Sequence, residues 1–180
     1  SSTPIWTSEQ LNGYARDMAF GDVTGDGNNN VIVATYDRVQ VLEAANGTKN
    51  WYYPVSGTIS SVACADFDED NIIDVAAGGS ADASGTPPNP GKSVWALRTI
   101  QSPLLWEFDF GEYGNALAID DLNDDEFMDV VTVCSIGDKA NAINGEDGSE
   151  LWEWIGTENL YAVTTGDFDN DGQIDVAVGG

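Results

Sequence analysis

The strongest constraint on the fold is a nine-residue, Asp-rich segment that recurs four times along the 180-residue chain. The copies begin at Asp22, Asp66, Asp121 and Asp167, so successive copies start 44, 55 and 46 residues apart. Each copy follows a short run of small or apolar residues and precedes a β-branched or small run, such as residues 130–133. These runs are too short for helices and predict strands. The repeat therefore predicts one supersecondary unit per copy, stacked along the chain.

Each of the first three Asp-rich loops is followed by a second apolar run and then a tryptophan, and these tryptophans are Trp51, Trp106 and Trp152. Asn46-Gly47 and Asp147-Gly148, which lie before two of them, are strong hairpin signals. Each unit thus holds four short strands in about 45 residues, the period of a propeller blade. The sequence predicts an all-β protein, a β-propeller of about four blades of four short strands, with one blade incomplete within the chain. The tryptophans are expected to pack between blades.

The blade units predicted from this repeat are residues 7–51, 52–106, 107–152 and 153–180, with residues 1–6 joined to the last unit. Residues 1–180 would then form a single propeller domain or an excerpt of a larger propeller. The 55-residue interval contains one insertion, from Ser80 to Gly91, which is rich in Gly, Pro, Ser and Ala and predicts an exposed loop. We expect it to project from the face opposite the Asp-rich loops.

The N-terminal segment repeats the end of a blade. Trp6 lies 16 residues before Asp22, close to the 15-residue steps from the later tryptophans to their next loops. The segment is therefore expected to form the fourth strand of a blade. It could join the last blade of its own chain, join a neighbouring copy in a head-to-tail assembly, or continue a longer chain. Assembly and continuation are the preferred interpretations, because self-closure leaves that blade with only three strands.

The Asp-rich loops have the spacing of calcium sites. Calcium takes six to eight oxygen ligands, and side chains at loop positions 1, 3, 5 and 9, with a backbone carbonyl at position 7, can converge on one ion. Asp and Asn are also ordinary turn residues, but four copies in phase favour metal binding. The predicted ligands, loop by loop, are Asp22, Thr24, Asp26, Asn28 and Asn30; Asp66, Asp68, Asp70, Ile72 and Asp74; Asp121, Asn123, Asp125, Phe127 and Asp129; and Asp167, Asp169, Asp171, Gln173 and Asp175.

These loops are not EF-hands, because position 12 falls in a strand instead of carrying the required Glu. The sequence predicts up to four calcium ions, and the first site should be the weakest because it has two carboxylates. Loop position 6 favours Gly for a tight turn. Gly27 and Gly172 fit that preference, Asn71 is acceptable, and Glu126 departs from it.

Charge and composition exclude several classes of protein. Six Lys and Arg residues stand against 31 Asp and Glu, a net charge of −25, so the chain should repel nucleic acids and anionic lipid. No apolar run is long enough to insert in a membrane. The sequence has no histidine, which removes the commonest general base and most zinc sites. Cys64 and Cys134 lie in apolar runs and are expected to be buried and free, with a disulfide as the alternative.

The Asp-rich loops between a small-residue strand and a Val-x-Val-Gly strand resemble FG-GAP/VCBS repeats, which form the calcium-bearing blades of integrin alpha-subunit propellers and many microbial surface proteins. The half with Ala140-Asn-Ala-Ile-Asn-Gly and Trp152 is similar to quinoprotein-type propeller repeats. Together the two halves cover nearly the whole chain. The resemblance implies a propeller with calcium loops on one face, a fold that hosts several unrelated functions.

The favoured function is a non-catalytic, extracellular or cell-surface module for adhesion, recognition or surface structure, with a protein or carbohydrate ligand left open. The alternative is an enzyme, such as a polysaccharide lyase or a quinoprotein fragment. Its candidate residues, expected on loops opposite the calcium face, are Tyr14, Arg16, Tyr53, Tyr113, Glu158, Tyr161 and residues 80–91. No base-plus-nucleophile set is visible among them. Asn46-Gly47-Thr48 is a glycosylation sequon, but a two-residue hairpin turn is the favoured interpretation.

Overall fold

The structure is a computed structural model that describes residues 3–8, 11, 13–55, 57–81, 93–99, 103–111 and 113–180. These residues form 14 strands and no helix, which confirms the predicted all-β class. The strands are β1 (Asp17–Gly21), β2 (Asn30–Ala34), β3 (Arg38–Glu43), β4 (Lys49–Pro54), β5 (Gly57–Ala65), β6 (Asp74–Ala81), β7 (Val94–Leu97), β8 (Leu104–Phe108), β9 (Gly114–Asp120), β10 (Asp129–Cys134), β11 (Lys139–Ile143), β12 (Glu150–Ile155), β13 (Ala162–Gly166) and β14 (Asp175–Gly179).

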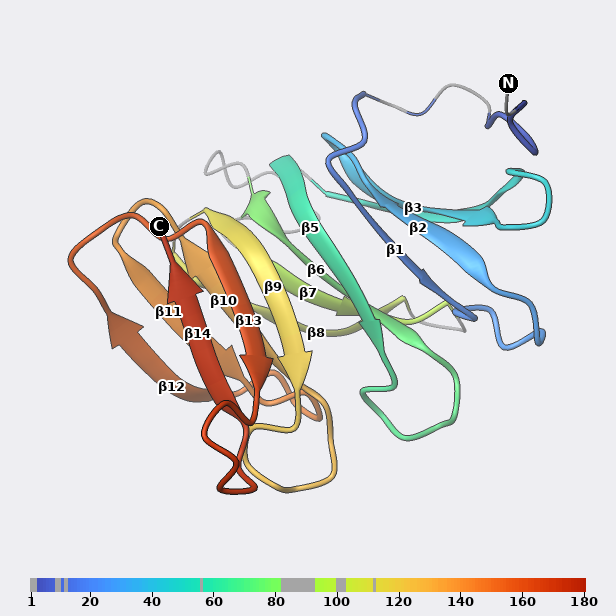
Figure 1. Cartoon of the computed structure of the whole chain (residues 1–180). Helices are drawn as coiled ribbons and strands as arrows, with labels where there is room; N and C mark the ends of the chain where they lie inside the picture. Colours follow the sequence, from blue (N-terminus) through green and yellow to red (C-terminus); the bar gives the residue numbers. More distant parts are fainter. Residues whose placement is uncertain are drawn as a thin grey trace.

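The strands form antiparallel sheets that follow the order of the chain. Blade 1 is β1-β2-β3-β4, blade 2 is β5-β6-β7-β8, and blade 3 is β9-β10-β11-β12, whereas blade 4 consists of β13 and β14. The first strand of each blade lies beside the first strand of the next, so β1 neighbours β5, β5 neighbours β9, and β9 neighbours β13. The blades therefore fan out around these inner strands, as Figure 1 shows. This arrangement confirms the β-propeller architecture.

The core lies between blades, because a single four-stranded sheet has two apolar faces to bury. One cluster joins blade 1 to blade 2 and includes Ile32, Val41 and Trp95. A second joins blade 2 to blade 3 around Phe67 and Trp106, whose rings meet edge to face with centroids 6.1 Å apart. A third, smaller cluster joins blade 3 to blade 4.

The recurring tryptophans lie in these clusters, as predicted. Trp51 packs against the first cluster, Trp106 belongs to the second, and Trp152 packs against the third. Each comes from the fourth strand of its blade. A large aromatic side chain at this position buries much of the apolar area that holds successive blades together.

The sheets form an open arc, and the two ends of the chain lie at opposite ends of it (Figure 1). The N-terminal segment is therefore not joined to the last blade of its own chain. Residues 3–7 are also not in a strand, contrary to the prediction that they form the fourth strand of a blade. A strand needs a hydrogen-bonded neighbour, and no described strand lies beside this segment in a sheet.

Local expectations are mostly confirmed. Cys64 and Cys134 form no disulfide with each other, and Cys134 is fully buried as predicted, whereas Cys64 is only partly buried. Burial raises the pKa of Cys64 to about 12. The Asn46-Gly47 signal does mark the β3–β4 hairpin, but the amide of Glu43 donates to the carbonyl of Thr48. The hairpin loop thus spans residues 44–47 and is longer than the two-residue turn expected. None of the described residues belongs to a helix long and apolar enough to cross a membrane.

Candidate metal sites

The four Asp-rich loops connect the first strand of each blade to the second and lie at one end of the blades (Figure 1). In each loop the carboxylate at position 1 accepts a backbone N–H from position 6: Gly27 donates to Asp22 at 2.8 Å, Asn71 to Asp66 at 2.9 Å, Glu126 to Asp121 at 3.0 Å, and Gly172 to Asp167 at 3.1 Å. The position 1 side chain therefore lies inside the loop, with the backbone wrapped around it.

A second shared contact fixes the middle of each loop. The carboxylate at position 5 accepts the N–H of position 7: Asn28 donates to Asp26, Ile72 to Asp70, Phe127 to Asp125, and Gln173 to Asp171, at 2.8 to 2.9 Å. These hydrogen bonds hold the backbone of the position 7 residue against the side chain at position 5 in every loop.

Wrapping the backbone this tightly requires left-handed conformations at two positions. Position 6 has positive φ in all four loops, as its preference for Gly predicts, and Glu126 adopts φ +77° despite its side chain. Position 4 shares this feature, which the sequence analysis missed: the residues are Gly25, Glu69, Asp124 and Asn170, with φ from +55° to +69°. For residues with a Cβ this conformation costs about 1–2 kcal/mol each.

The side chain at position 9 closes each loop. One of its oxygens accepts the N–H of position 2, from Val23 to Asn30 at 3.2 Å, Phe67 to Asp74 at 3.1 Å, Leu122 to Asp129 at 3.0 Å, and Phe168 to Asp175 at 3.0 Å. An amide oxygen and a carboxylate oxygen make this contact equally well, which explains how Asn30 fits the first loop.

The second loop brings three carboxylates close together. Asp66, Asp68 and Asp74 each offer an oxygen within 4.8 Å of the others. Asp74 is only 1% exposed, and its Oδ1 and the buried Oδ1 of Asp66 have no hydrogen-bond partner. Burial, with the nearby Asp68, Asp70 and Asp66 carboxylates, raises the pKa of Asp74 to about 7, against one backbone donor that lowers it. A buried carboxylate with an orphan oxygen calls for a cation or a proton.

The fourth loop offers the same set of ligands in a more exposed setting. Oxygens of Asp167, Asp169 and Asp175 lie within 4.8 Å of one another. Calcium–oxygen distances are about 2.3–2.6 Å, so oxygens on opposite sides of one ion stand about 5 Å apart. The second and fourth loops therefore both have the dimensions of a calcium site.

The third loop uses its carboxylates differently. Both oxygens of Asp129 accept backbone N–H groups, from Leu122 at 3.0 Å and Gly145 at 3.0 Å. Burial raises the pKa of Asp129, while these two donors lower it. Oδ2 of Asp125 accepts the side-chain amides of Asn123 at 2.7 Å and Asn144 at 3.1 Å. Amide donors here take up oxygens that a cation would need.

In each of blades 1 to 3, one further residue reaches the Asp-rich loop, and sequence reasoning missed it. Counted from the blade tryptophan, Glu43, Arg98 and Asn144 hold the same place, directly after the third-strand run. Arg98 pairs with Asp68 at 2.9 Å, Asn144 donates to Asp125, and Glu43 accepts from Asn30 at 3.4 Å. Their shared place in the repeat was the signal that could have revealed them.

The described residues proposed for the enzyme alternative are spread over all four blades. Tyr14, Arg16, Tyr113, Glu158 and Tyr161 precede the first strands of blades 1, 3 and 4, at the end opposite the Asp-rich loops, as expected. Tyr53 was wrongly assigned to a loop. It is a buried core residue, because β4 continues through it and pairs it with Val39. Of the 80–91 insertion, Ser80 and Ala81 belong to β6, and the rest lies outside the described residues.

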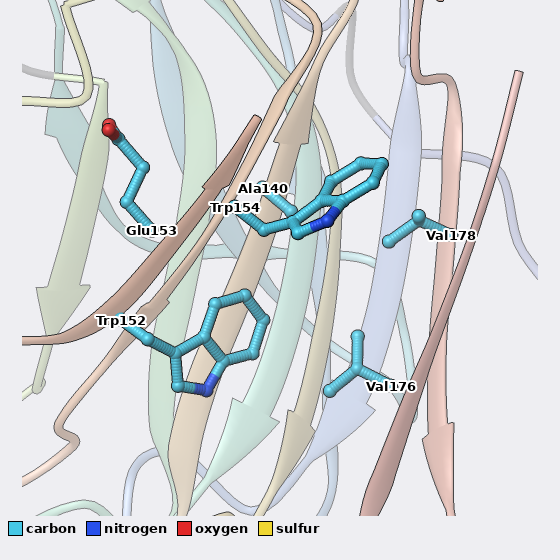
Figure 2. A pocket seen from close by; sticks show the side chains of 6 residues that line it. All are labelled: Ala140, Trp152, Glu153, Trp154, Val176 and Val178. Atoms are coloured by element: carbon cyan, nitrogen blue, oxygen red, sulfur yellow. The ribbon is translucent and has the colours of Figure 1, made fainter. Parts of the chain in front are cut away.

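The described residues line two of the cavities at places away from the Asp-rich loops. Tyr14 lines one of about 320 Å³ with Gly13, Tyr36 and Asp37. A larger one, of about 510 Å³, is lined by Ala140, Trp152, Glu153, Trp154, Val176 and Val178. Figure 2 shows that the Trp154 and Trp152 rings of blade 3 and the two valines of β14 surround this apolar cleft.

Comparison with known proteins agrees with the fold and with one of the repeats. Residues 22–77 match the family model of the FG-GAP-like repeat, which confirms the resemblance seen in the sequence. These residues contain the first and second Asp-rich loops. No curated protein matches the chain.

Three solved structures share the fold at low identity. The V. cholerae biofilm matrix protein Bap1 is 19% identical over 90% of this chain, with a TM-score of 0.65. The computationally designed Ika4 protein is 15% identical over 100% of both chains, with a TM-score of 0.67. BamB from Moraxella catarrhalis is 12% identical over 92% of this chain, with a TM-score of 0.57. The chain spans 23% of Bap1 and 44% of BamB.

Proposed function

We propose that this chain is a non-catalytic, extracellular β-propeller module whose Asp-rich loops bind calcium. The observation that carries the proposal is the second loop. There, the nearly fully buried Asp74 has one oxygen without a hydrogen-bond partner and lies beside the carboxylates of Asp66 and Asp68. Asp66 and Asp68 are partly buried, and Arg98 pairs with Asp68, but the structure gives no cationic partner to the nearly fully buried Asp74 among the described residues. A buried carboxylate beside two others is unfavourable unless a cation or a proton compensates it.

Calcium suits these loops better than magnesium does. The ligands are carboxylate oxygens with, in our proposal, one carbonyl from position 7, all held by a loop without regular structure. Calcium accepts such irregular oxygen cages, whereas magnesium keeps most of its waters and rarely enters an all-protein cage. The fourth and second loops should bind most tightly, the third less tightly because amides occupy its oxygens, and the first least tightly because it has two carboxylates.

An extracellular setting follows from the affinity expected. Extracellular calcium modules bind with dissociation constants of about 10⁻⁴–10⁻³ M, which leaves them filled only where calcium is abundant. The FG-GAP-like repeat and the structural likeness to a biofilm matrix protein support this location. In this function calcium stiffens the blades, and a protein or carbohydrate ligand binds the opposite end, where Tyr14 and Tyr36 line a cavity.

The proposal is tested by titrating calcium into the chelator-treated chain in a calorimeter, with magnesium as the competing ion. Asp171→Ala should remove a tight site and lower the melting temperature of the calcium-loaded protein. Asp26→Ala, the matched change in the first loop, should have a smaller effect. A melting temperature that calcium does not change, or equal effects of the two substitutions, would contradict the proposal and the ranking respectively.

A further inference from the structure

Successive blades of this chain pack through two chemically different faces. On the first strand of a blade, the side chains four and two residues before the Asp-rich loop lie on the face toward the preceding blade, here called the upstream face. In blade 2 they are Val62 and Cys64, which pack in the cluster shared with blade 1. In blade 3 they are Leu117 and Ile119, which pack in the cluster shared with blade 2.

The opposite, downstream face carries small residues that receive these side chains. A Cβ added at Gly78 in blade 2 would stand 3.0 Å from Leu117, so the space is already occupied by the next blade. Ala19 of blade 1 likewise packs in the cluster that contains Val62. Large residues against small ones thus form the contact between successive blades.

Blade 1 has an upstream face with no described partner. Met18 and Phe20 hold the same two positions in β1, yet they are 64% and 61% exposed, whereas Val62 is 6% exposed. Blade 4 has the complementary face free. Ala162 and Thr164 of β13 and Ala177 and Gly179 of β14 are all exposed and small. None of these six side chains is charged, on a chain whose net charge is −25.

The N-terminal segment supplies an independent observation. Nε1 of Trp106, in the fourth strand of blade 2, donates to the carbonyl of Gly145 in the hairpin of blade 3 at 2.6 Å. Nε1 of Trp6 makes the same contact with Ala44 in the hairpin of blade 1, at 2.7 Å. The two rings also lie against equivalent glycines, Gly148 and Gly47. Trp6 therefore occupies the place of the outermost tryptophan of a blade that precedes blade 1.

We propose that a second copy of this chain supplies that preceding blade, so that copies associate head to tail. Met18 and Phe20 of one copy pack against the small downstream face of β13 and β14 in the other. The segment around Trp6 then lies beside blade 4 of the other copy, whose outer positions are open at the cleft in Figure 2. The same contact already occurs between each pair of successive blades within one chain, and a heterologous contact of this kind joins unlike surfaces.

The unlike surfaces make the proposal testable by complementation. An upstream variant carries Met18→Glu and Phe20→Glu, and a downstream variant carries Thr164→Glu and Ala177→Glu. Sedimentation velocity of the full chain should show association that increases with concentration, and each variant alone should be monomeric. Mixing the two variants should restore one intact contact and give a one-to-one dimer. Ile136→Glu, at another exposed apolar residue (58% exposed), is the control and should associate like the parent.

Circular dichroism melting separates loss of association from loss of folding, since the substituted side chains are exposed. A parent chain that stays monomeric at its highest soluble concentration would overturn the proposal. Self-association of the downstream variant alone would overturn it too, because it would indicate contact between two like faces. Loss of association in the Ile136→Glu control would show that added charge alone is responsible and would also overturn it.

Discussion

The guanidinium of Arg98 lies 2.9 Å from Oδ2 of Asp68, at loop position 3 of the second Asp-rich loop. This places a tethered positive charge where calcium needs a free carboxylate. The second and fourth loops carry the same carboxylates in sequence, yet the arginine is found only at the second among the described residues. In the proposed calcium site, calcium competes with Arg98 for Asp68.

Arg98→Met should therefore increase calcium affinity at the second loop. The pair is partly exposed, and such pairs contribute about 0.2–1 kcal/mol, so an increase of about 1.4- to fivefold is expected. Calorimetric titration in an Asp171→Ala background isolates the second site from the fourth. Arg38→Met is the control, because Arg38 pairs with Asp37 at the other end of blade 1. Unchanged calcium affinity would mean that breaking the ion pair between Arg98 and Asp68 costs no free energy.

The calcium-free protein should become more stable as pH falls from 8 to 5. Burial raises the pKa of Asp74 to about 7, so the folded state takes up a proton between pH 7 and the ordinary value of 3.8, where the unfolded chain does not. Stability is therefore lost as pH rises through this range. Melting in chelator across the range measures the effect.

Asp74→Asn is the control for that pH dependence. It keeps the oxygen that accepts from Phe67, as Asn30 does in the first loop. The variant should be more stable than the parent at pH 8 without calcium, and its stability should vary less with pH. If stability varied with pH as steeply in Asp74→Asn as in the parent, the pH dependence would come from the net charge of −25 and not from Asp74.

Glu126→Gly should stabilise the protein. Glu126 is exposed and adopts φ +77°, a conformation that costs a residue with a Cβ about 1 kcal/mol or more relative to glycine. Its N–H still donates to Asp121 after the change. A rise in the midpoint of denaturant unfolding is expected. Gly172→Glu, the reverse change in the fourth loop, should lower the midpoint, and effects of the same sign would exclude backbone strain as the cause.

The inter-blade tryptophans should differ in what their ring nitrogens contribute. Nε1 of Trp106 donates to Gly145, whereas Nε1 of Trp51 is buried without a partner. Trp106→Phe loses a hydrogen bond and leaves a buried carbonyl unsatisfied, so it should cost about 1 kcal/mol more than Trp51→Phe. Chemical denaturation of both variants makes the comparison. A larger loss for Trp51→Phe would show that shape, not hydrogen bonding, dominates.

The repeat made the blades and the common shape of the Asp-rich loops predictable. Asp22 and Asp167 recur in phase with strand patterns, and both lie in loops of the same geometry. The repeat marks the place of Arg98, but it does not identify the residue that Arg98 contacts. Arg98 reaches Asp68 across 30 residues only because the third strand ends beside the loop. Tyr53 was misplaced because the length of β4 depends on its pairing with β3, which no local signal gives.

The hydrogen bond at position 9 gives a loop its shape whether or not the side chain there is charged. Asn30, with no charge, closes the first loop by the same bond to a backbone N–H that Asp175 makes in the fourth. A blade can therefore exchange the acidic residue here for a neutral one without losing its outline. Mutation can therefore remove the negative charge at position 9 of one loop while the other loops keep theirs. In a chain built from such repeats, the charge of each loop can change independently of the others.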